Sequence, residues 1–207
     1  MNRIKRDWPR AAAAAGLLVL AAAFLLRFSY STSFLWPGYC GYDSAIFQTI
    51  GKYWAEGSVP YRDLFDHKGP LIFFIDMIGY LLWGRAGILV PQTISLAAAL
   101  FFLYKLGRVY LPRPGATGAA LAALVYLART FDEGNMTEEY ALPFIAASLW
   151  LAARWCEEQK RDPAAPHPWR YAAVYGLSFG AILLLRVTSA VSIGSFVLVI
   201  ALYTLAR

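Results

Sequence analysis

The sequence is short of charge and nearly lacks cysteine and histidine. Only 15% of its 207 residues are charged and 59% are hydrophobic, whereas about a quarter of the residues in an average soluble domain are charged. It has two cysteines and two histidines, without the spacing of a metal site. These shortages exclude a disulfide-rich secreted module and, with a mean hydropathy of +0.48, indicate an integral membrane protein.

A single long basic patch is also absent. The net charge of +6 arises from Lys and Arg residues scattered through the short segments between apolar runs. Nucleic-acid-binding proteins gather such residues on one face or along one helix. The composition therefore predicts a lipid bilayer as a partner and no nucleic acid.

The apolar runs predict an all-α polytopic membrane protein of one domain, residues 1–207, with about six transmembrane helices. Each crossing helix needs about 20 residues, which short runs reach by extending into flanking polar positions. A seventh run, 70–84, is short and has Asp76 at its middle. A carboxylate at the centre of a crossing helix costs about 2.5–3.5 kcal/mol, so we expect this run to be juxtamembrane or re-entrant. The six expected spans are about 11–29, 88–106, 115–130, 139–155, 171–185 and 189–206.

The N-terminal run has two interpretations. Basic residues precede the apolar stretch Ala11–Leu26, as in a retained signal anchor whose N-terminus stays in the cytoplasm. A cleaved signal peptide is the alternative, with Ala21-Ala22-Ala23 as the small residues at the cleavage site. The anchor fits better and predicts a multi-pass protein of the inner (cytoplasmic) membrane.

The distribution of basic residues favours this topology. If 70–84 does not cross, twelve of the 19 Lys and Arg residues are cytoplasmic; if it crosses, seven are. The positive-inside rule prefers the first arrangement. The outer loop 30–87, the loop 131–138 and the turn 186–188 then face one compartment. Cys40 and Cys156 fall on opposite sides, so no disulfide between them is expected.

The first outer loop is far longer than two helices need for their connection. Residues 43–56 have the apolar periodicity of an amphipathic helix lying at the membrane interface, followed by Gly57 as a stop signal. Asp43 stands at its start. It is either the N-cap of this helix or a catalytic base, and the second reading needs further acids and a cation nearby.

The same loop ends in Asp66-His67-Lys68-Gly69-Pro70, directly before the run 70–84. This order places the Lys68 ammonium and His67 at the headgroup plane. A compact cation there suits a phosphate group. General attraction to lipid headgroups is the alternative.

Acidic residues also mark the loop 131–138. Thr137 is expected to cap the following helix, and Glu138 and Glu139 fall in its first turn, where the helix dipole favours carboxylates. They are also candidate catalytic acids. Arg186, at the outer end of a later span, would pair with one of them or with a phosphate, or serve as an interfacial anchor.

These residues, in this order, resemble the GT-C glycosyltransferases. The similar elements are Asp43-Ser44 at the head of an interfacial helix, Pro60-Tyr61-Arg62-Asp63, Asp66 to Leu71, Leu106-Gly107-Arg108, Thr137 to Pro143 and Leu184-Leu185-Arg186. The similarity is closest to bacterial relatives of the protein O-mannosyltransferases and to the lipid A aminoarabinose transferases. It covers about residues 10–207 and corresponds to the N-terminal half of such enzymes.

The resemblance implies sugar transfer from a polyprenyl-phosphate donor at the outer face of the cytoplasmic membrane. It implies Asp43 as the acid that deprotonates the acceptor, Lys68 as a contact to the donor phosphate, with His67 and Arg186 beside it, and Glu138 or Glu139 as the second acid. Ser44 stands where many relatives have a second acid, and the relatives are more than twice as long. We therefore expect a truncated portion, or a short paralogue that needs a C-terminal portion or a partner subunit.

Two other classes of function stay open. A transporter or flippase-like subunit would carry its polar residues within the spans. A non-catalytic assembly subunit would need none of these acids. The sequence requires no cofactor; the acids would accept a divalent cation, but their spacing does not demand one. It leaves the donor sugar and the acceptor open.

Overall fold

The computed structural model describes residues 2–39 and 41–205, and the side chains of residues 11–39 and 41–205. Cys40 lies outside the described residues, so the expectation about a disulfide stays a prediction. The described chain forms helices and no strand. They are α1 (Asn2–Phe28), α2 (Asp43–Ala55), α3 (Pro70–Trp83), η1 (Ala86–Ile88), α4 (Leu89–Tyr110), α5 (Arg113–Thr130), α6 (Thr137–Arg161), α7 (Trp169–Leu185), η2 (Val187–Ala190) and α8 (Val191–Leu205).

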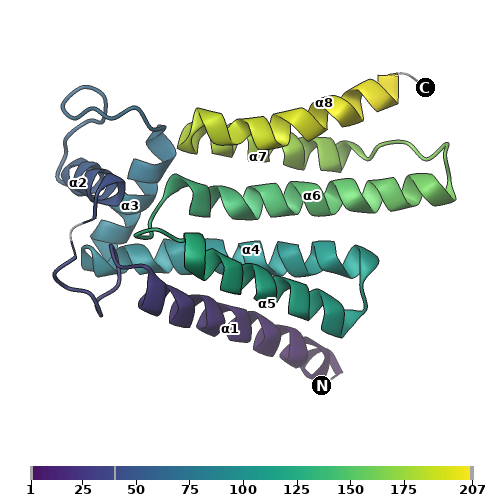
Figure 1. Cartoon of the computed structure of the whole chain (residues 1–207), viewed down its shortest axis with the longest axis horizontal. Helices are drawn as coiled ribbons and strands as arrows, with labels where there is room; N and C mark the ends of the chain where they lie inside the picture. Colours follow the sequence, from purple (N-terminus) through teal and green to yellow (C-terminus); the bar gives the residue numbers. More distant parts are fainter. Residues whose placement is uncertain (1, 40, 206–207) are drawn as a thin grey trace.

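Helices α1 and α4 to α8 lie side by side, and α2 and α3 cover one end of them (Figure 1). The all-helical class is thus confirmed. Within the described residues, three helical stretches are long and apolar enough to cross a membrane: Ala11–Phe28, Pro70–Tyr110 and Val187–Leu205. Helix α7 is apolar but shorter. That six helices cross stays a prediction.

The two helices of the first loop begin where the sequence predicts. Helix α2 begins at Asp43 and ends at Ala55, and Gly57 then adopts the left-handed φ of +100° that a stop signal requires. Helix α3 begins at Pro70, whose fixed φ suits a first helical position. Its 14 residues make it about 21 Å long, which is shorter than the hydrocarbon core.

The chain reverses direction tightly between α3 and α4. A Cβ atom on Gly87 would lie 2.1 Å from the Gly79 carbonyl oxygen, so these glycines permit the close approach. Asp76 in α3 is fully buried and accepts a hydrogen bond from the Asn135 amide at 2.9 Å. Because this carboxyl faces protein rather than lipid, the insertion cost that argued against a crossing α3 is partly offset.

Two apolar clusters hold the bundle together. The first joins α2, α3, α6, α7 and the α8 region at the end that carries the first loop; its fully buried members include Phe47, Phe73, Ile182 and Leu185. The second joins α1, α4 and α5 around Leu25 and Leu100. The first cluster therefore lies directly beneath the polar loops.

Candidate functional site

Backbone contacts bring three distant segments together at one end of the bundle (Figure 1). The Ser31 amide donates to the Glu133 carbonyl at 2.9 Å, and the Ser31 hydroxyl donates to the Gly134 carbonyl at 2.8 Å. The Gly69 amide donates to the Leu185 carbonyl at 3.1 Å. The first loop, the loop before α6 and the end of α7 thus form one surface.

Asp43 and Lys68 form an ion pair on this surface. The Lys68 Nζ atom lies 3.3 Å from Asp43 Oδ2, and the ammonium also lies 5.5 Å from the centre of the Phe47 ring. The Lys68 side chain is 5% exposed and that of Asp43 is 49% exposed. A nearly buried cation needs a partner, and here Asp43 supplies it while keeping one side open to solvent.

Asp43 is not the N-cap of α2, so the expectation that it caps this helix is wrong. The cap position is Tyr42, whose side chain makes no capping hydrogen bond. Glu133, from the loop before α6, accepts the Tyr42 amide at 2.6 Å and the Ser44 amide at 2.9 Å. Because another carboxylate satisfies the helix N-terminus, Asp43 remains available for Lys68.

Glu133 was not predicted from the sequence as a site residue. It is 3% exposed and also accepts a long hydrogen bond from the Tyr39 hydroxyl at 3.4 Å. Burial, with Glu133 beside it, raises the pKa of Tyr39 above its usual value. Gly41 permits the close approach, because its φ is +71° and a Cβ there would lie 2.6 Å from Glu133 Oε2, but nothing in the sequence links the two residues.

The residues before Lys68 shape the loop that presents it. Asp66 accepts the Lys68 amide at 2.9 Å, and the Tyr61 hydroxyl donates to the Lys68 carbonyl at 2.6 Å. Burial, and then the charge of Asp66, raise the pKa of Tyr61. His67 is 76% exposed, and its Nε2 atom lies 3.0 Å from Lys68 Nζ. Asp66 and Tyr61 thus hold the backbone amide and the backbone carbonyl of Lys68 in place.

Asp63 closes the tip of the same loop. Its carboxylate accepts two hydrogen bonds from the Arg62 guanidinium, each 2.8 Å long, and one from the Val59 amide at 2.8 Å. The Arg62 hydrogen bonds, followed by that from Val59, lower the pKa of Asp63 to about 2. Asp63 is therefore an anion that maintains the turn.

Glu138 and Arg186 form a second ion pair on the same surface. The Arg186 guanidinium donates to the Glu138 carboxylate, and the two side chains are 38% and 51% exposed. The Gly69 amide meets the carbonyl of Leu185, the residue before Arg186. Since Lys68 directly precedes Gly69, the Asp43–Lys68 and Glu138–Arg186 pairs belong to adjoining segments.

Glu139 points away from both pairs. Its carboxylate accepts the Met136 amide at 3.0 Å and the Gln92 side-chain amide at 3.0 Å, and Gln92 in turn accepts the Thr32 hydroxyl at 2.6 Å. The cap of α6 is Met136 rather than Thr137, which corrects that expectation. Of the two acids predicted for this helix, the structure brings Glu138 to Arg186 and places Glu139 in an interior network.

Arg85 and Asn135 also position the site, and neither stood out in the sequence. Arg85 donates hydrogen bonds to four carbonyl groups of the first loop, those of Tyr30, Ser31, Trp36 and Pro37. Asn135 is fully buried at a φ of +62°, and its side-chain oxygen accepts the Tyr140 hydroxyl at 2.8 Å. These contacts anchor the loops to the helices.

An apolar groove of about 560 Å³ begins beside the loop. Leu71, three residues after Lys68, lines it together with Ile75 of α3 and Phe144 of α6. Residues of α4 and α7 complete its walls. The groove therefore runs between apolar helices from Leu71, the second residue of α3, and no charged side chain of the described residues lines it.

The described residues contain no cluster of three or more His, Cys, Asp or Glu side chains that would hold a metal ion. The acids of the site are instead engaged with Lys68, Arg186, Arg62 and backbone amides. What the arrangement offers chemically is a half-exposed carboxylate, Asp43, beside the Lys68 ammonium.

Residues 8–206 match the model of the family described as "Putative competence-induced protein Ccs4 N-terminal domain". No curated protein and no solved structure matches the chain. Because the matched residues make up nearly the whole sequence, the chain belongs to the competence-induced protein Ccs4 N-terminal domain family.

Proposed function

We propose that this chain provides the catalytic surface of a GT-C-type glycosyltransferase. The donor is a sugar linked to a polyprenyl phosphate, and transfer takes place at the outer face of the cytoplasmic membrane. The description of the family names no reaction, so the proposal is supported by the residues of the surface and by the resemblance of their order to that superfamily.

One observation carries the proposal. Lys68, which pairs with Asp43, is followed three residues later by Leu71, which lines the apolar groove, although neither member of the pair lines the groove itself. A polyprenyl phosphate combines a long apolar chain with an anionic head, so its binding site needs a hydrophobic channel ending at cations. The neighbouring Arg186 side chain, 38% exposed, supplies a second cation at the same surface.

In the proposed reaction the acceptor hydroxyl attacks the anomeric carbon of the donor sugar. Asp43 takes the hydroxyl proton, a bond forms between the acceptor oxygen and the carbon, and the bond from that carbon to the phosphate oxygen breaks. The polyprenyl phosphate leaves with the electron pair. General-base assistance of this kind contributes about 10²–10⁴-fold to a rate.

The cations divide the work according to their exposure. Arg186 and His67 present accessible side chains to the leaving phosphate, which gains negative charge. Lys68 is nearly buried and holds Asp43 in position through their ion pair. Glu138 orients Arg186. This division assigns Glu139 a supporting role beneath the surface.

The proposal includes a topology. Six helices, α1 and α4 to α8, cross the membrane, the N-terminus is cytoplasmic, and α2 and α3 lie at the outer interface. The gathering of all three polar segments at one end of the bundle (Figure 1) supports it, because a common site needs them in one compartment.

The transporter alternative has less support. Two pairs of polar groups between the helices bind one another, Asp76 with Asn135 and Gln92 with Glu139. Asp76 Oδ1 and Ser148 Oγ have no hydrogen-bond partner among the described residues, but both atoms are buried. A transport site would instead leave such groups open to a passage. The assembly-subunit alternative predicts that the Asp43–Lys68 pair can be removed without a phenotype, and the experiment below distinguishes it.

The test uses cells that carry the complete gene with its natural partners. Their membranes are supplied with a panel of radiolabelled polyprenyl-phosphate sugars, and the release of polyprenyl phosphate is measured, because this product forms whatever the acceptor. Asp43→Asn is expected to lower the release about 10²-fold or more at normal protein levels. Glu56→Gln is the matched control, since it removes an exposed carboxylate from the far end of α2.

Release at the parental rate in Asp43→Asn would show that the base assignment is wrong. Deletion of the whole gene without any loss of release would reject sugar transfer itself and favour the assembly subunit or the transporter. Equal losses in Asp43→Asn and Glu56→Gln would trace the effect to α2 as a structure rather than to the reaction.

A further inference from the structure

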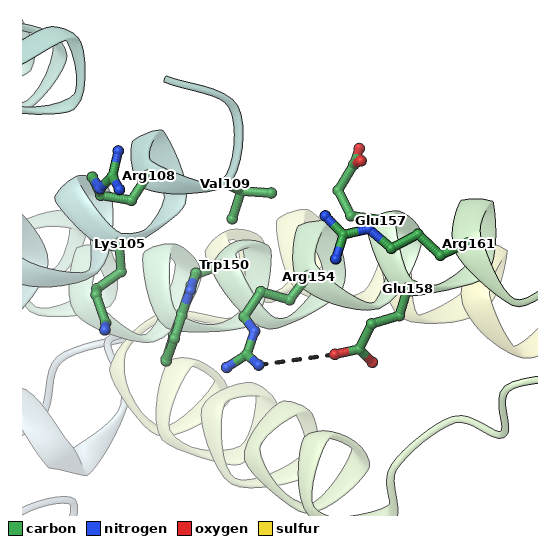
Figure 2. A pocket seen from close by; sticks show the side chains of 8 residues that line it. All are labelled: Lys105, Arg108, Val109, Trp150, Arg154, Glu157, Glu158 and Arg161. Atoms are coloured by element: carbon green, nitrogen blue, oxygen red, sulfur yellow. Dashed lines mark ion pairs between the residues drawn. The ribbon is translucent and has the colours of Figure 1, made fainter. Parts of the chain in front are cut away.

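A basic groove lies at the opposite end of the bundle, between the C-terminal ends of α4 and α6 (Figures 1 and 2). Its volume is about 350 Å³. Four cationic side chains line it, two from each helix: Lys105, Arg108, Arg154 and Arg161. None of them belongs to the Asp43–Lys68 surface, and the proposed sugar transfer does not use them.

The two acids that line this groove are already engaged. Glu157 pairs with Lys160 at 2.6 Å, and Glu158 pairs with Arg154 at 3.8 Å, the contact drawn in Figure 2. With four cations against two carboxylates, the groove is net positive. Glu157 pairs with Lys160, which does not line the groove. Because this pair neutralises Glu157, the excess of positive charge in the groove is larger still.

Three cations of the basic groove therefore have no anionic partner within the part of the chain that the structure describes. They are Lys105, Arg108 and Arg161. Basic residues at helix ends are common, because they complement the helix dipole and the inner membrane surface. Those effects do not require that cations from two helices face one cavity.

An indole ring stands in the middle of the groove. Figure 2 shows Trp150 between Lys105 and Arg154, whose charged groups lie 5.3 Å and 5.7 Å from the ring centre. Phe101, one turn before Lys105, is 41% exposed, and its ring lies 5.7 Å from the same ammonium. Tryptophan prefers the headgroup level of a membrane, and the exposed phenyl ring offers adjacent surface for an acyl chain.

We propose that the basic groove binds the headgroup phosphate of an anionic phospholipid. Basic pockets between membrane helices bind such headgroups through several cations at once. Lys105, Arg108 and Arg161 would contact the phosphate, Trp150 would pack on the glycerol region, and the acyl chains would follow Phe101 along α4. A soluble phosphate would have no use for the apolar surface at Phe101.

The test measures lipid retention by the purified full chain in detergent, using native mass spectrometry. The parent is expected to retain added phosphatidylglycerol and to retain little of the zwitterionic phosphatidylcholine. Arg108→Gln with Arg161→Gln removes two cations without breaking an ion pair, and phosphatidylglycerol binding is expected to weaken about tenfold or more. Arg170→Gln is the matched control, because Arg170 is an exposed arginine at the same end that does not line the groove.

Each outcome either supports the proposal or overturns it. Weakening confined to the double variant, with an intermediate effect of Arg108→Gln alone, supports the proposal. Unchanged retention in the double variant, or an equal loss in Arg170→Gln, overturns it in favour of general surface charge. If millimolar inorganic phosphate displaces the lipid completely, the groove is a site for free phosphate and the lipid assignment is wrong. Thermal unfolding of the variants, measured in parallel, confirms that each is folded.

Discussion

The two ends of the bundle treat positive charge in opposite ways. At the end with the Asp43–Lys68 surface, Lys68 meets Asp43, Arg186 meets Glu138, and Arg85 meets four backbone carbonyls. At the basic groove, Lys105, Arg108 and Arg161 have no anionic partner among the described residues. A buried cation without a partner is costly, whereas an exposed one is not.

The two ends also differ in how closely the backbone packs. A Cβ added to Gly69 would lie 2.1 Å from the Leu184 carbonyl oxygen, and one added to Gly134 would lie 2.2 Å from the Ser29 hydroxyl. At the other end the approach is less close: a Cβ added to Gly107 would lie 3.2 Å from Ala116, and Gly118 meets nothing within 4 Å. The closest backbone contacts thus lie at the first end, whereas the basic groove depends on accessible charge. Substitutions at the first end should therefore lower the stability of the fold. Substitutions in the basic groove should remove positive charge and leave the fold intact.

The largest expected effect is that of Gly69→Ala. Because the new methyl group would overlap a backbone carbonyl that cannot move independently, we expect a loss of about 3 kcal/mol in the free energy of unfolding. The measurement is unfolding of the purified protein in mixed detergent micelles. Gly176→Ala is the control; it lies exposed within α7 and should stabilise the helix by about 0.5–1 kcal/mol.

Equal stability of the two alanine variants would contradict the close contact between the first loop and α7. The Lys68 and Arg186 segments would then not adjoin, and a shared site would lose its geometric basis. A loss of stability in Gly69→Ala at normal helix content would show that only the junction between the first loop and α7 had opened.

A smaller effect is expected from Glu133→Gln. One carboxylate oxygen becomes an NH₂ group that faces a backbone N–H, so either the Tyr42 or the Ser44 amide loses its acceptor. Leaving a buried donor unpaired costs about 1–3 kcal/mol. Hydrogen exchange of the first-turn amides of α2 should accelerate accordingly. Asp132→Asn is the control, because Asp132 is exposed and Asn tolerates its positive φ; faster exchange in both variants would refute the cap.

Local patterns explain why the helices could be predicted. The apolar stripe of 43–56, the stop at Gly57 and the start at Pro70 all act within a few residues, and α2 and α3 begin where these signals lie. The number of crossing helices could not be settled in this way. Asp76 illustrates the difficulty, since its cost in a membrane depends on Asn135, a residue 59 positions away.

The site was predictable only where neighbours in sequence determine the contact. The turn residues that hold the Lys68 backbone, Tyr61 and Asp66, are its neighbours in sequence. The sequence did not reveal that the Lys68 side chain is nearly buried against Asp43, and its contact with a phosphate stays a prediction. The cap of α2 did not, because Glu133 lies 91 positions from Tyr42. For the same reason Glu138 and Glu139 looked equivalent, although only the fold reveals that Gln92 engages Glu139 and Arg186 engages Glu138.

The smallest expected effect concerns Asp63, whose neighbours Arg62 and Val59 hold its pKa at about 2 in the folded loop, below the ordinary value of 3.8. The folded state thus holds its proton less tightly than the unfolded state, so this carboxylate supports the turn fully above about pH 4 and loses that support as the pH falls towards 2. Carbon-13 NMR of aspartate-labelled protein in micelles should follow the titration directly. Arg62→Gln removes the larger cause and should move the midpoint up towards 3.8 without changing the contact between Lys68 and Asp43. A parental midpoint near 3.8 would mean that the Arg62–Asp63 contact is open in solution, and the tip of the loop would then resemble the accessible charges of the basic groove rather than the paired ones beside Lys68.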